Sequence, residues 1–191
     1  MELESTRLYY RPLTQEDACD LYEIYSKPEA LRWLSVPLHV DVDETLEGIR
    51  ACERSCMKTK QAMPFVIVEK KRDKVIGTID FHHSCSPHSM EIGYLLHPAY
   101  WHQGYMREAL LCMLKYGFQT LGLHRVNAVC AKQNTASIVL LEKIGFRLEG
   151  NYPKNILLGD GKFYAMVLFS LMVEEWRNLY EERIGSQIRS S

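Results

Sequence analysis

The sequence lacks a long apolar run and carries almost no net charge. A membrane-spanning helix needs about 20 consecutive apolar residues, and no segment of the 191-residue chain reaches that length. The first residues, MELESTRLYYRP, include acidic side chains where a secretory leader would be basic. With a formal net charge of −1, the composition gives no electrostatic reason to expect a nucleic acid or an anionic membrane as partner. We therefore expect a cytoplasmic protein that binds neither.

Metal and nucleotide motifs are missing as well. The six cysteines form no Cys-x-x-Cys pair, which indicates reduced thiols. The segment FHHSCSPHS (81–89) gathers His82, His83, Cys85 and His88, but this spacing matches no zinc pattern, and neighbouring histidines of a strand point to opposite faces. We expect a solvated loop there and no metal. Neither GK[ST] of the Walker type nor G-x-G-x-x-G occurs, which argues against the common nucleotide-binding folds.

What the chain does have is the composition of a globular domain. Hydrophobic residues make up 47% of the sequence and charged residues 25%, which is too apolar for a disordered chain. The length suits a single domain that covers residues 1–191, with no repeat and no low-complexity linker. The stretch at about 174–191 is polar, and we expect it to form a C-terminal helix that ends in a tail.

The hydrophobic period changes along the chain from helical to strand-like and then alternates. After a strand at 7–12, we predict a helix at about 15–26 and a second one from Asp43 or Thr45 to about Lys60. The remaining predicted elements are strands at 64–70, 75–82 and 89–98, a helix at 104–121, a strand at 124–131, a helix at 134–145, and strands at 146–153 and 163–172. This order predicts an α/β (α+β) domain with a mixed sheet and helices on both faces.

The stretch WHQGYMREALLCMLKYGF (101–118) places Gly104 in a polar turn directly before an amphipathic helix. Glycine allows a positive φ and a close approach of the backbone to a ligand. The N–H groups of Gly104, Tyr105, Met106 and Arg107 are then unpaired donors at a helix start, next to the positive end of the helix dipole. Such a turn suits a phosphate or a pyrophosphate. A glycine that merely begins a helix is the alternative.

A second stretch, NTASIVLLEKIGFRLEG (134–150), combines a polar cluster, a short helix, Gly145 as helix stop and a strand. Together the two stretches resemble the GNAT superfamily of acetyl-CoA-dependent N-acetyltransferases, in its RimJ/RimL-like branch. The opening ESTRLYYRPLTQEDACDLYEIYSKPEALRWLS is similar to the branch's first strand and two helices. MEIGYLLHPAYWHQGYMREAL is similar to its central strand and pyrophosphate loop, and LLGDGKFYAMVLFSLM to its final hairpin. The resemblance spans nearly the whole chain.

The resemblance implies a GNAT fold with a mixed, mostly antiparallel central sheet and acetyl-CoA in a cleft between central strands. It implies that backbone donors of the turn bind the pyrophosphate, and that the backbone of Leu95 and Leu96 and the side chain of Asn134 hold the pantetheine arm. For Arg107 and Lys143, contact with the outer phosphates competes with an ordinary solvated helix charge. The implied cofactor-binding set is Leu95, Leu96, Gln103, Gly104, Tyr105, Met106, Arg107, Asn134 and Lys143.

Two catalytic residues follow from the resemblance. Glu91, on the strand before the turn, is the candidate base for the amine proton, because its apolar neighbours should raise its pKa. A strand-edge glutamate in a salt bridge is the alternative. The superfamily often places a tyrosine acid in the last helix, where this chain has Leu141. Ser137, one turn earlier, is the branch's substitute as hydrogen donor to the sulfur, and a serine that caps or packs in the first turn is the alternative.

The implied acceptor is a primary amine. At pH 7.4 roughly a fifth of α-amino groups but only about one lysine in a thousand is neutral, so a site with one base and no tyrosine acid suits an α-amine. We expect direct acetyl transfer to a protein or peptide N-terminus. The alternatives are a small amine (polyamine, amino-acid conjugate or antibiotic) and a non-catalytic acetyl-CoA-binding module. The candidates for the acceptor cleft, each equally explicable as a half-buried core aromatic, are Trp33, His82, Tyr94 and Tyr152. The branch also includes homodimers.

Overall fold

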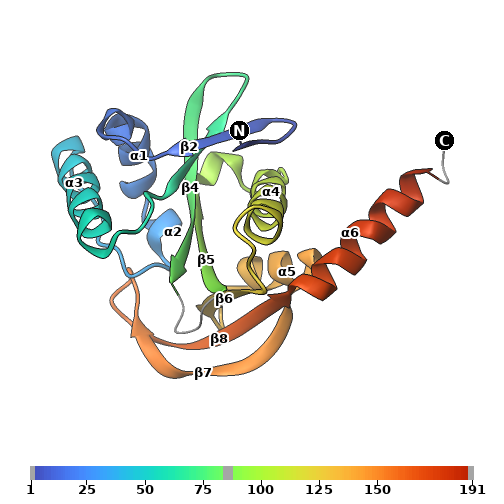
Figure 1. Cartoon of the computed structure of the whole chain (residues 1–191). Helices are drawn as coiled ribbons and strands as arrows, with labels where there is room; N and C mark the ends of the chain where they lie inside the picture. Colours follow the sequence, from blue (N-terminus) through green and yellow to red (C-terminus); the bar gives the residue numbers. More distant parts are fainter. Residues whose placement is uncertain (1–2, 84–87, 189–191) are drawn as a thin grey trace.

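The computed structural model describes residues 3–83 and 88–188, and Cys85 of the predicted loop lies outside them. These residues form an eight-stranded sheet with the order β1-β2-β3-β4-β5-β6-β8-β7 (Figure 1). Every neighbouring pair is antiparallel except β5 and β6, which are parallel. The strands are β1 (Leu3–Glu4), β2 (Leu8–Pro12), β3 (Phe65–Glu69), β4 (Lys74–His83), β5 (Ser89–Leu96), β6 (Arg125–Ala131), β7 (Arg147–Leu157) and β8 (Phe163–Met172).

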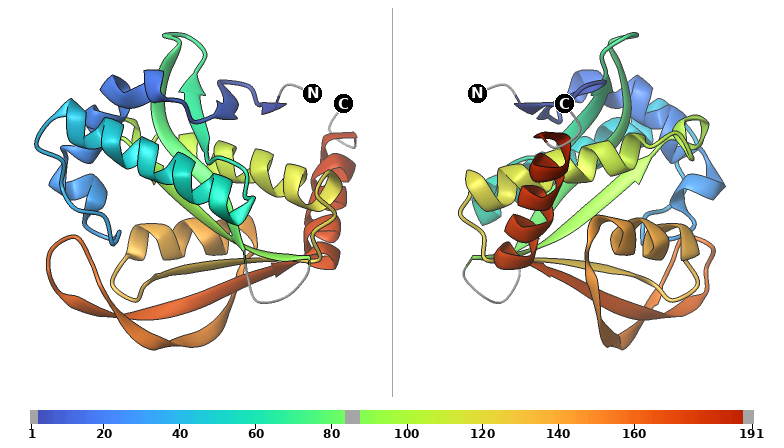
Figure 2. Two further views of the ribbon diagram at one scale, coloured as in Figure 1. Left: turned by 60° about the vertical axis from the view of Figure 1, so that its left-hand side comes forward. Right: turned by 90° about the vertical axis from the view of Figure 1, so that its right-hand side faces the viewer.

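Helices cover both faces of the sheet. Figure 2 shows α1 and α3 on one face and α4 on the other. The C-terminal helix α6 leads away from the sheet in Figure 1. The helices are α1 (Ala18–Tyr25), α2 (Pro28–Leu31), α3 (Val42–Thr59), α4 (Tyr105–Gln119), α5 (Thr135–Ile144) and α6 (Val173–Ile188), with short 3-10 turns η1 (Gln15–Asp17) and η2 (Pro98–Tyr100). The predicted fold class, a mixed and mostly antiparallel sheet between helices, is confirmed.

Strand alternation divides the buried side chains into two cores. On β4, Ile79 packs into the core under α4 and α5, with Phe81 against it. Gly117 on α4 leaves the space for that ring, since a Cβ there would come 2.9 Å from Phe81 Cζ. On β3, Val66 and Val68 belong to the second core, under α1 and α3. Because side chains alternate along a strand, Asp80 and His82 lie on the α1/α3 face.

The sheet opens between its two parallel strands. β5 and β6 pair only from Ser89 with Arg125 to Glu91 with Asn127. Beyond that point β6 stays paired with β8 as far as Ala131, whereas β5 stays paired with β4 as far as Leu96. Figure 2 shows the two halves of the sheet diverging from this point. The crevice beyond the carboxyl ends of parallel strands is a common ligand position in α/β proteins.

Some element boundaries differ from those predicted. Helix α3 begins earlier than Asp43, because Asp41 is its N-cap and accepts a hydrogen bond from the Glu44 amide at 2.8 Å. The strand predicted to end at Pro153 continues to Leu157, with an irregular register between Asn151 and Asn155. The hydrophobic period did not predict the short helix α2, but α2 lies in the segment that resembles the two-helix start of the RimJ/RimL-like branch. In residues 3–83 and 88–188, no helix is long and apolar enough to cross a membrane.

Candidate active site

The turn before α4 has the geometry of an anion site. Gly104 is the N-cap residue with φ 80°, a left-handed conformation that glycine adopts without steric cost. The first backbone bond of the helix runs from Glu108 N to Gly104 O at 3.0 Å. Among the described residues, the N–H groups of Gly104, Tyr105, Met106 and Arg107 have no acceptor outside the helix. Their dipoles converge at the helix start and favour a negative charge.

Arg7, which the sequence analysis did not single out, braces this turn from 96 residues away in the chain. Its Nε donates to Glu108 Oε2 at 2.7 Å and its Nη1 donates to Gln103 O at 3.0 Å. Its guanidinium also lies 4.0 Å from the centre of the Tyr105 ring. The backbone N–H of Arg7 and the hydroxyl of Ser5 donate to the other carboxylate oxygen of Glu108. The turn is therefore held by a cation that also lies close to Gly104.

The backbone of β5 offers hydrogen-bonding groups to the opening. His97 N donates to Ile76 O at 2.8 Å. Because paired residues alternate in an antiparallel ladder, the backbone of Leu95 also faces β4, and that of Tyr94 and Leu96 faces the opening. The carbonyl oxygen of Leu96 accepts the Trp101 indole N–H at 2.9 Å. Of the two residues predicted for the pantetheine arm, Leu96 thus presents its backbone to the opening, whereas the backbone of Leu95 is paired with β4. The backbone of Tyr94 also faces the opening.

On the other side of the opening, the start of α5 carries the predicted polar residues. The Asn134 side-chain oxygen accepts a hydrogen bond from Ser137 N at 3.2 Å, which caps the helix. The Ser137 hydroxyl in turn contacts the Tyr94 hydroxyl at 2.5 Å. Burial strongly raises the pKa of Tyr94 and raises that of the nearby Cys130 thiol to about 11. Leu141, where the superfamily often has a tyrosine, is fully buried in the core.

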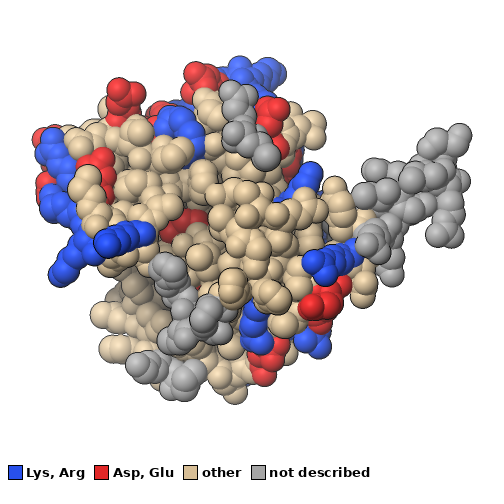
Figure 3. Space-filling view, in the orientation of Figure 1, with Lys and Arg blue, Asp and Glu red and all other residues tan. Residues whose placement is uncertain are grey.

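A cavity of about 360 Å³ lies on the α1/α3 side of the sheet. In the face drawn in Figure 3, a recessed acidic surface lies near the centre, surrounded by uncharged residues. The lining is mostly apolar, with a few polar groups, as in many small-molecule sites. Its lining residues are Leu13, Tyr25, Leu34, Val36, His39, Thr45, Gly48, Ile49, Cys52, Pro64, Thr78, Asp80, His82, Gly93, Tyr94 and Leu95.

Two titratable side chains of the cavity lining, Asp80 and His82, lie on the same face of the sheet as a third, Glu91. His82 pairs across the strands with Glu91, and Asp80 pairs with Gly93. His82 Nδ1 lies 3.4 Å from Asp80 Oδ2. A Cβ on Gly93 would come 2.8 Å from His82 Nε2, so the glycine leaves the space that the imidazole occupies. Burial raises the pKa of Asp80 and of Glu91, and the charge of His82 opposes both shifts.

The predicted site residues do not all come together. His82 and Tyr94 line the cavity, whereas Trp33 and Tyr152 pack against a separate small core with Tyr164. Glu91 is next to His82 but is not part of the lining. Arg107 and Lys143 are exposed on their helices. The sequence analysis missed Asp80. Alternation along the strand places it on one face with His82, but only strand pairing shows that Glu91 shares this face.

A larger cavity, of about 610 Å³, lies beside β1 and β2. Its charged groups are already paired: Lys70 with Glu4 at 2.7 Å, and Arg11 with Asp17 at 2.6 Å. It therefore offers no free charge for a ligand. No cluster of three metal-ligating side chains occurs in the described part of the chain.

Comparison with known proteins decides between the possible uses of such a turn and cleft. Residues 7–147 match the family model described as the acetyltransferase (GNAT) domain. The chain belongs to the GNAT acetyltransferase family. GNAT enzymes are acyltransferases that use acetyl-CoA, so the predicted family and enzyme class are confirmed.

Three similar proteins illustrate the relationship. An uncharacterized N-acetyltransferase of Bacillus licheniformis is 32% identical over 178 residues, covering 91% of this chain and 97% of the relative. The [ribosomal protein uS5]-alanine N-acetyltransferase of Escherichia coli is 31% identical over 121 residues, 62% of each chain, which supports the RimJ/RimL-like branch. The crystal structure of a GNAT-family acetyltransferase from Bacillus anthracis is 28% identical, with a TM-score of 0.78 and coverage of 91% and 99%.

Proposed function

We propose that this GNAT enzyme transfers the acetyl group of acetyl-CoA directly to a primary amine in one ternary complex, and that the acceptor is the α-amine of a protein or peptide N-terminus. The observation that carries the proposal is the placement of Asp80 and His82 in a cavity that adjoins the opening between β5 and β6. Acetyl-CoA in the opening and the amine in the cavity then approach each other from opposite faces of the sheet, and the amine nitrogen can reach the thioester carbonyl carbon.

The proposed donor site begins at the turn before α4. The N–H groups of Gly104 to Arg107 bind the pyrophosphate, and the guanidinium of Arg7 adds a positive charge. The arm then lies in the opening as an added strand on the backbone groups of Tyr94 and Leu96 that face it. Because the Asn134 side-chain oxygen caps α5, its amide NH₂ remains for the arm. A backbone N–H of β5 near Tyr94 polarises the thioester oxygen.

The proposed acceptor site is the cavity on the other face. The carboxylate of Asp80 attracts the ammonium form of the amine. Glu91, beside His82, accepts the proton through the imidazole or a water molecule, and a carboxylate whose pKa is raised by burial is a better base near neutral pH. The neutral amine then attacks the thioester carbon, and the sulfur departs with the bonding electrons.

The class of amine follows from proton affinity and from the shape of the cavity. A base of this kind readily deprotonates an α-amine of pKa about 7.7–8.0, and far less readily a lysine of pKa about 10.4. The cavity is open to the surface, so one terminal residue can enter while the rest of a peptide stays outside. A small amine is the second candidate, because the mostly apolar lining would also enclose one.

A matched pair of peptides tests the acceptor. One has a free N-terminus and a dimethylated lysine, and the other has an acetylated N-terminus and a free lysine of otherwise identical sequence. We expect acetylation of the first at least about a hundredfold faster, in line with the difference in neutral amine. Comparable rates for both, or acetylation of small amines alone, would contradict the α-amine assignment. Mass spectrometry of each product identifies the acetylated nitrogen.

A further inference from the structure

The Tyr94 and Ser137 side chains meet across the opening of the sheet. Tyr94 comes from β5 and Ser137 from the first turn of α5, and their hydroxyl oxygens lie 2.5 Å apart. The Tyr94 side chain packs against the core under α4 and α5, while the backbone of the same residue faces the opening. This contact is therefore made where β5 and β6 have separated, in the region that the thioester end of the proposed donor occupies.

The surroundings fix the direction of this hydrogen bond. In the part of the chain that the structure describes, the Tyr94 hydroxyl has Ser137 Oγ as its hydrogen-bond partner and no other. A buried phenol with a single partner gives its one hydrogen to that partner, because an unmade donor bond is costly. Burial raises the pKa of Tyr94, so the phenol keeps this hydrogen. The Ser137 oxygen is thus an acceptor for Tyr94, and its own hydrogen points to another acceptor, either the neighbouring Cys130 sulfur or a group bound in the opening.

We propose that Tyr94 is a positioning residue that orients the Ser137 hydroxyl so that the serine donates its hydrogen to the sulfur of acetyl-CoA. The proposal rests on the acetyl transfer proposed above. Helix α5 has Leu141, fully buried, in the position where a tyrosine would act directly. The phenol instead comes from β5 and acts through the serine.

The step balances without a change in either hydroxyl. The neutral amine nitrogen forms a bond to the carbonyl carbon, and the C–S bond breaks with the electron pair on sulfur. The second proton of the nitrogen passes to water, because Glu91 already holds the proton of the ammonium form. The Ser137 O–H donates a hydrogen bond to the thiolate, and water later supplies the thiol proton and removes the one on Glu91. A thiol has a pKa of about 8.5, so a donor that stabilises the thiolate is sufficient.

The kinetic test compares Tyr94→Phe, Ser137→Ala and the double variant. Removing a donor to a developing charge costs about 10²–10³ in kcat, and we expect that range for Ser137→Ala. Tyr94→Phe leaves the Ser137 hydroxyl free to rotate. For this variant we expect about a tenfold loss of kcat, and a KM for acetyl-CoA within about twofold of the wild-type value. The double variant should lose no more than Ser137→Ala alone, because Tyr94 acts through the serine.

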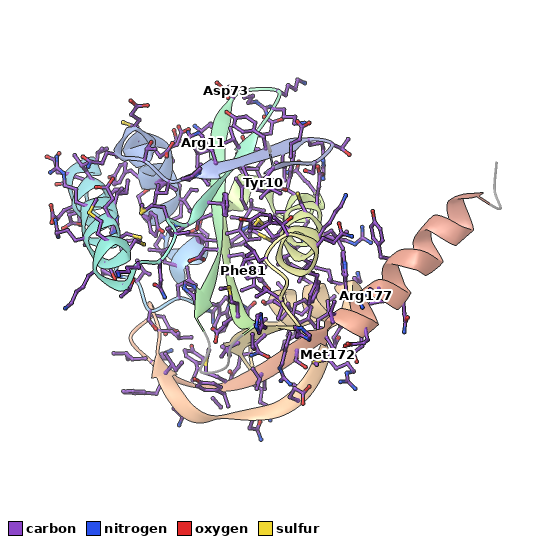
Figure 4. All side chains as sticks on the ribbon, viewed as in Figure 1. Tyr10, Arg11, Asp73, Phe81, Met172 and Arg177 are labelled. Carbon is purple, nitrogen blue, oxygen red and sulfur yellow. The ribbon has the colours of Figure 1, made fainter. Side chains whose placement is uncertain are left out.

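Tyr10→Phe is the matched control. Tyr10, labelled in Figure 4, is another buried tyrosine whose hydroxyl contacts a serine, Ser5 at 3.3 Å, but it lies on β2, three strands from β5. The Tyr10→Phe variant should lower the melting temperature about as much as Tyr94→Phe and leave kcat unchanged. Full activity of Tyr94→Phe, or losses that multiply in the double variant, would overturn the proposal.

A second measurement needs no acceptor. The thiol of bound CoA is titrated by the ultraviolet absorbance of its thiolate. We expect its pKa to be lower in the wild-type complex than in free CoA, and to rise by about one pH unit, equivalent to a tenfold change, in Tyr94→Phe and in Ser137→Ala. The same thiol pKa in all complexes would contradict the role of Tyr94. A wild type that shows the shift but acetylates no amine would contradict only the proposed function.

Discussion

Asp80 and Glu91 are both carboxylates with a raised pKa, but the structure gives them different surroundings. Asp80 lines the cavity, whereas Glu91 lies outside the lining and pairs across the strands with His82. Burial is the main cause of both shifts, and the interaction with the His82 imidazole acts against it. A buried carboxylate that faces a cationic ligand is suited to binding, and one that receives a proton through a neighbour is suited to base catalysis.

Exchange of each carboxylate for its amide separates these roles. Glu91→Gln should lower kcat about a hundredfold at pH 7.5 and remove the acidic limb of the kcat–pH profile. Asp80→Asn should raise the KM for the acceptor about tenfold and keep that limb. Initial rates from pH 5 to 9 at saturating acetyl-CoA provide both numbers. If the limb disappeared in Asp80→Asn and persisted in Glu91→Gln, the assignments would be reversed.

The raised pKa of Glu91 also has a consequence for stability. A carboxyl whose folded-state pKa lies above its unfolded value, near 4.5, contributes stability at low pH that is lost as pH rises through the folded pKa. The melting temperature of Glu91→Gln should therefore rise relative to that of the wild type as the pH is raised from 4 to 7.5. Glu149→Gln is the control of opposite sign, because the Ser170 hydroxyl lowers the pKa of Glu149. Equal pH dependence in both variants would contradict the burial of Glu91.

At the start of α4, the proposed binding of the donor depends on one local conformation. Gly104 has φ 80°, and the space beside it is open except for Arg7 Nη2, 3.6 Å from a Cβ built there. A Cβ would thus meet only the end of the Arg7 side chain, at ordinary contact distance, but a side chain would occupy the position from which the proposed phosphate approaches the N–H groups. It would also be held at a positive φ, which is especially unfavourable for a β-branched residue.

Gly104→Val should abolish measurable acetyl-CoA binding, read by isothermal titration calorimetry. Gly122→Val is the matched control, since Gly122 also has a positive φ of 67° and nothing within 4 Å of its Cβ. Both variants carry the same backbone strain, and only the first fills the turn. Normal affinity in a folded Gly104→Val variant would refute the placement of the pyrophosphate.

Arg7 connects the β1–β2 turn to the start of α4 and holds the carbonyl of Gln103. Arg7→Gln should weaken acetyl-CoA binding about tenfold, because the hydrogen bonds of a charged group are lost, with little change in kcat. Arg11→Gln is the control, since Arg11 forms a similar pair with Asp17 away from the turn. It should lower the melting temperature and leave the dissociation constant unchanged. Equal effects of both variants on binding would leave Arg7 as a purely structural residue.

Local patterns predicted most of the fold, and contacts between distant segments supplied the rest. The helix after Gly104 and the one after Asn134 were predicted because a turn residue and an amphipathic run are adjacent in the sequence. Arg7, Asp80 and the bond between Tyr94 and Ser137 were not, because each depends on strand register or on contacts over 43 residues or more. Pro153 suggested a strand end, yet pairing with β8 resumes beyond it at Asn155.

The two faces of the sheet carry groups of different chemistry on either side of one opening. The α4 side provides the N–H groups and the cation of an anion site, and the α1/α3 side provides the carboxylates and the imidazole. The opening between β5 and β6 lies between them. A donor and an acceptor bound on opposite faces can react directly, without an acetylated enzyme intermediate.

The release of free thiol from acetyl-CoA shows whether this direct transfer takes place. The acceptors are offered as separate pools of N-terminal peptides, including ribosomal-protein sequences, and of polyamines, aminoglycosides and amino acids. We predict release that depends on the peptide pool and that disappears in Gly104→Val. Silence from every pool, while acetyl-CoA still raises the melting temperature, would contradict the account and identify the protein as an acetyl-CoA-binding module without transferase activity towards these amines.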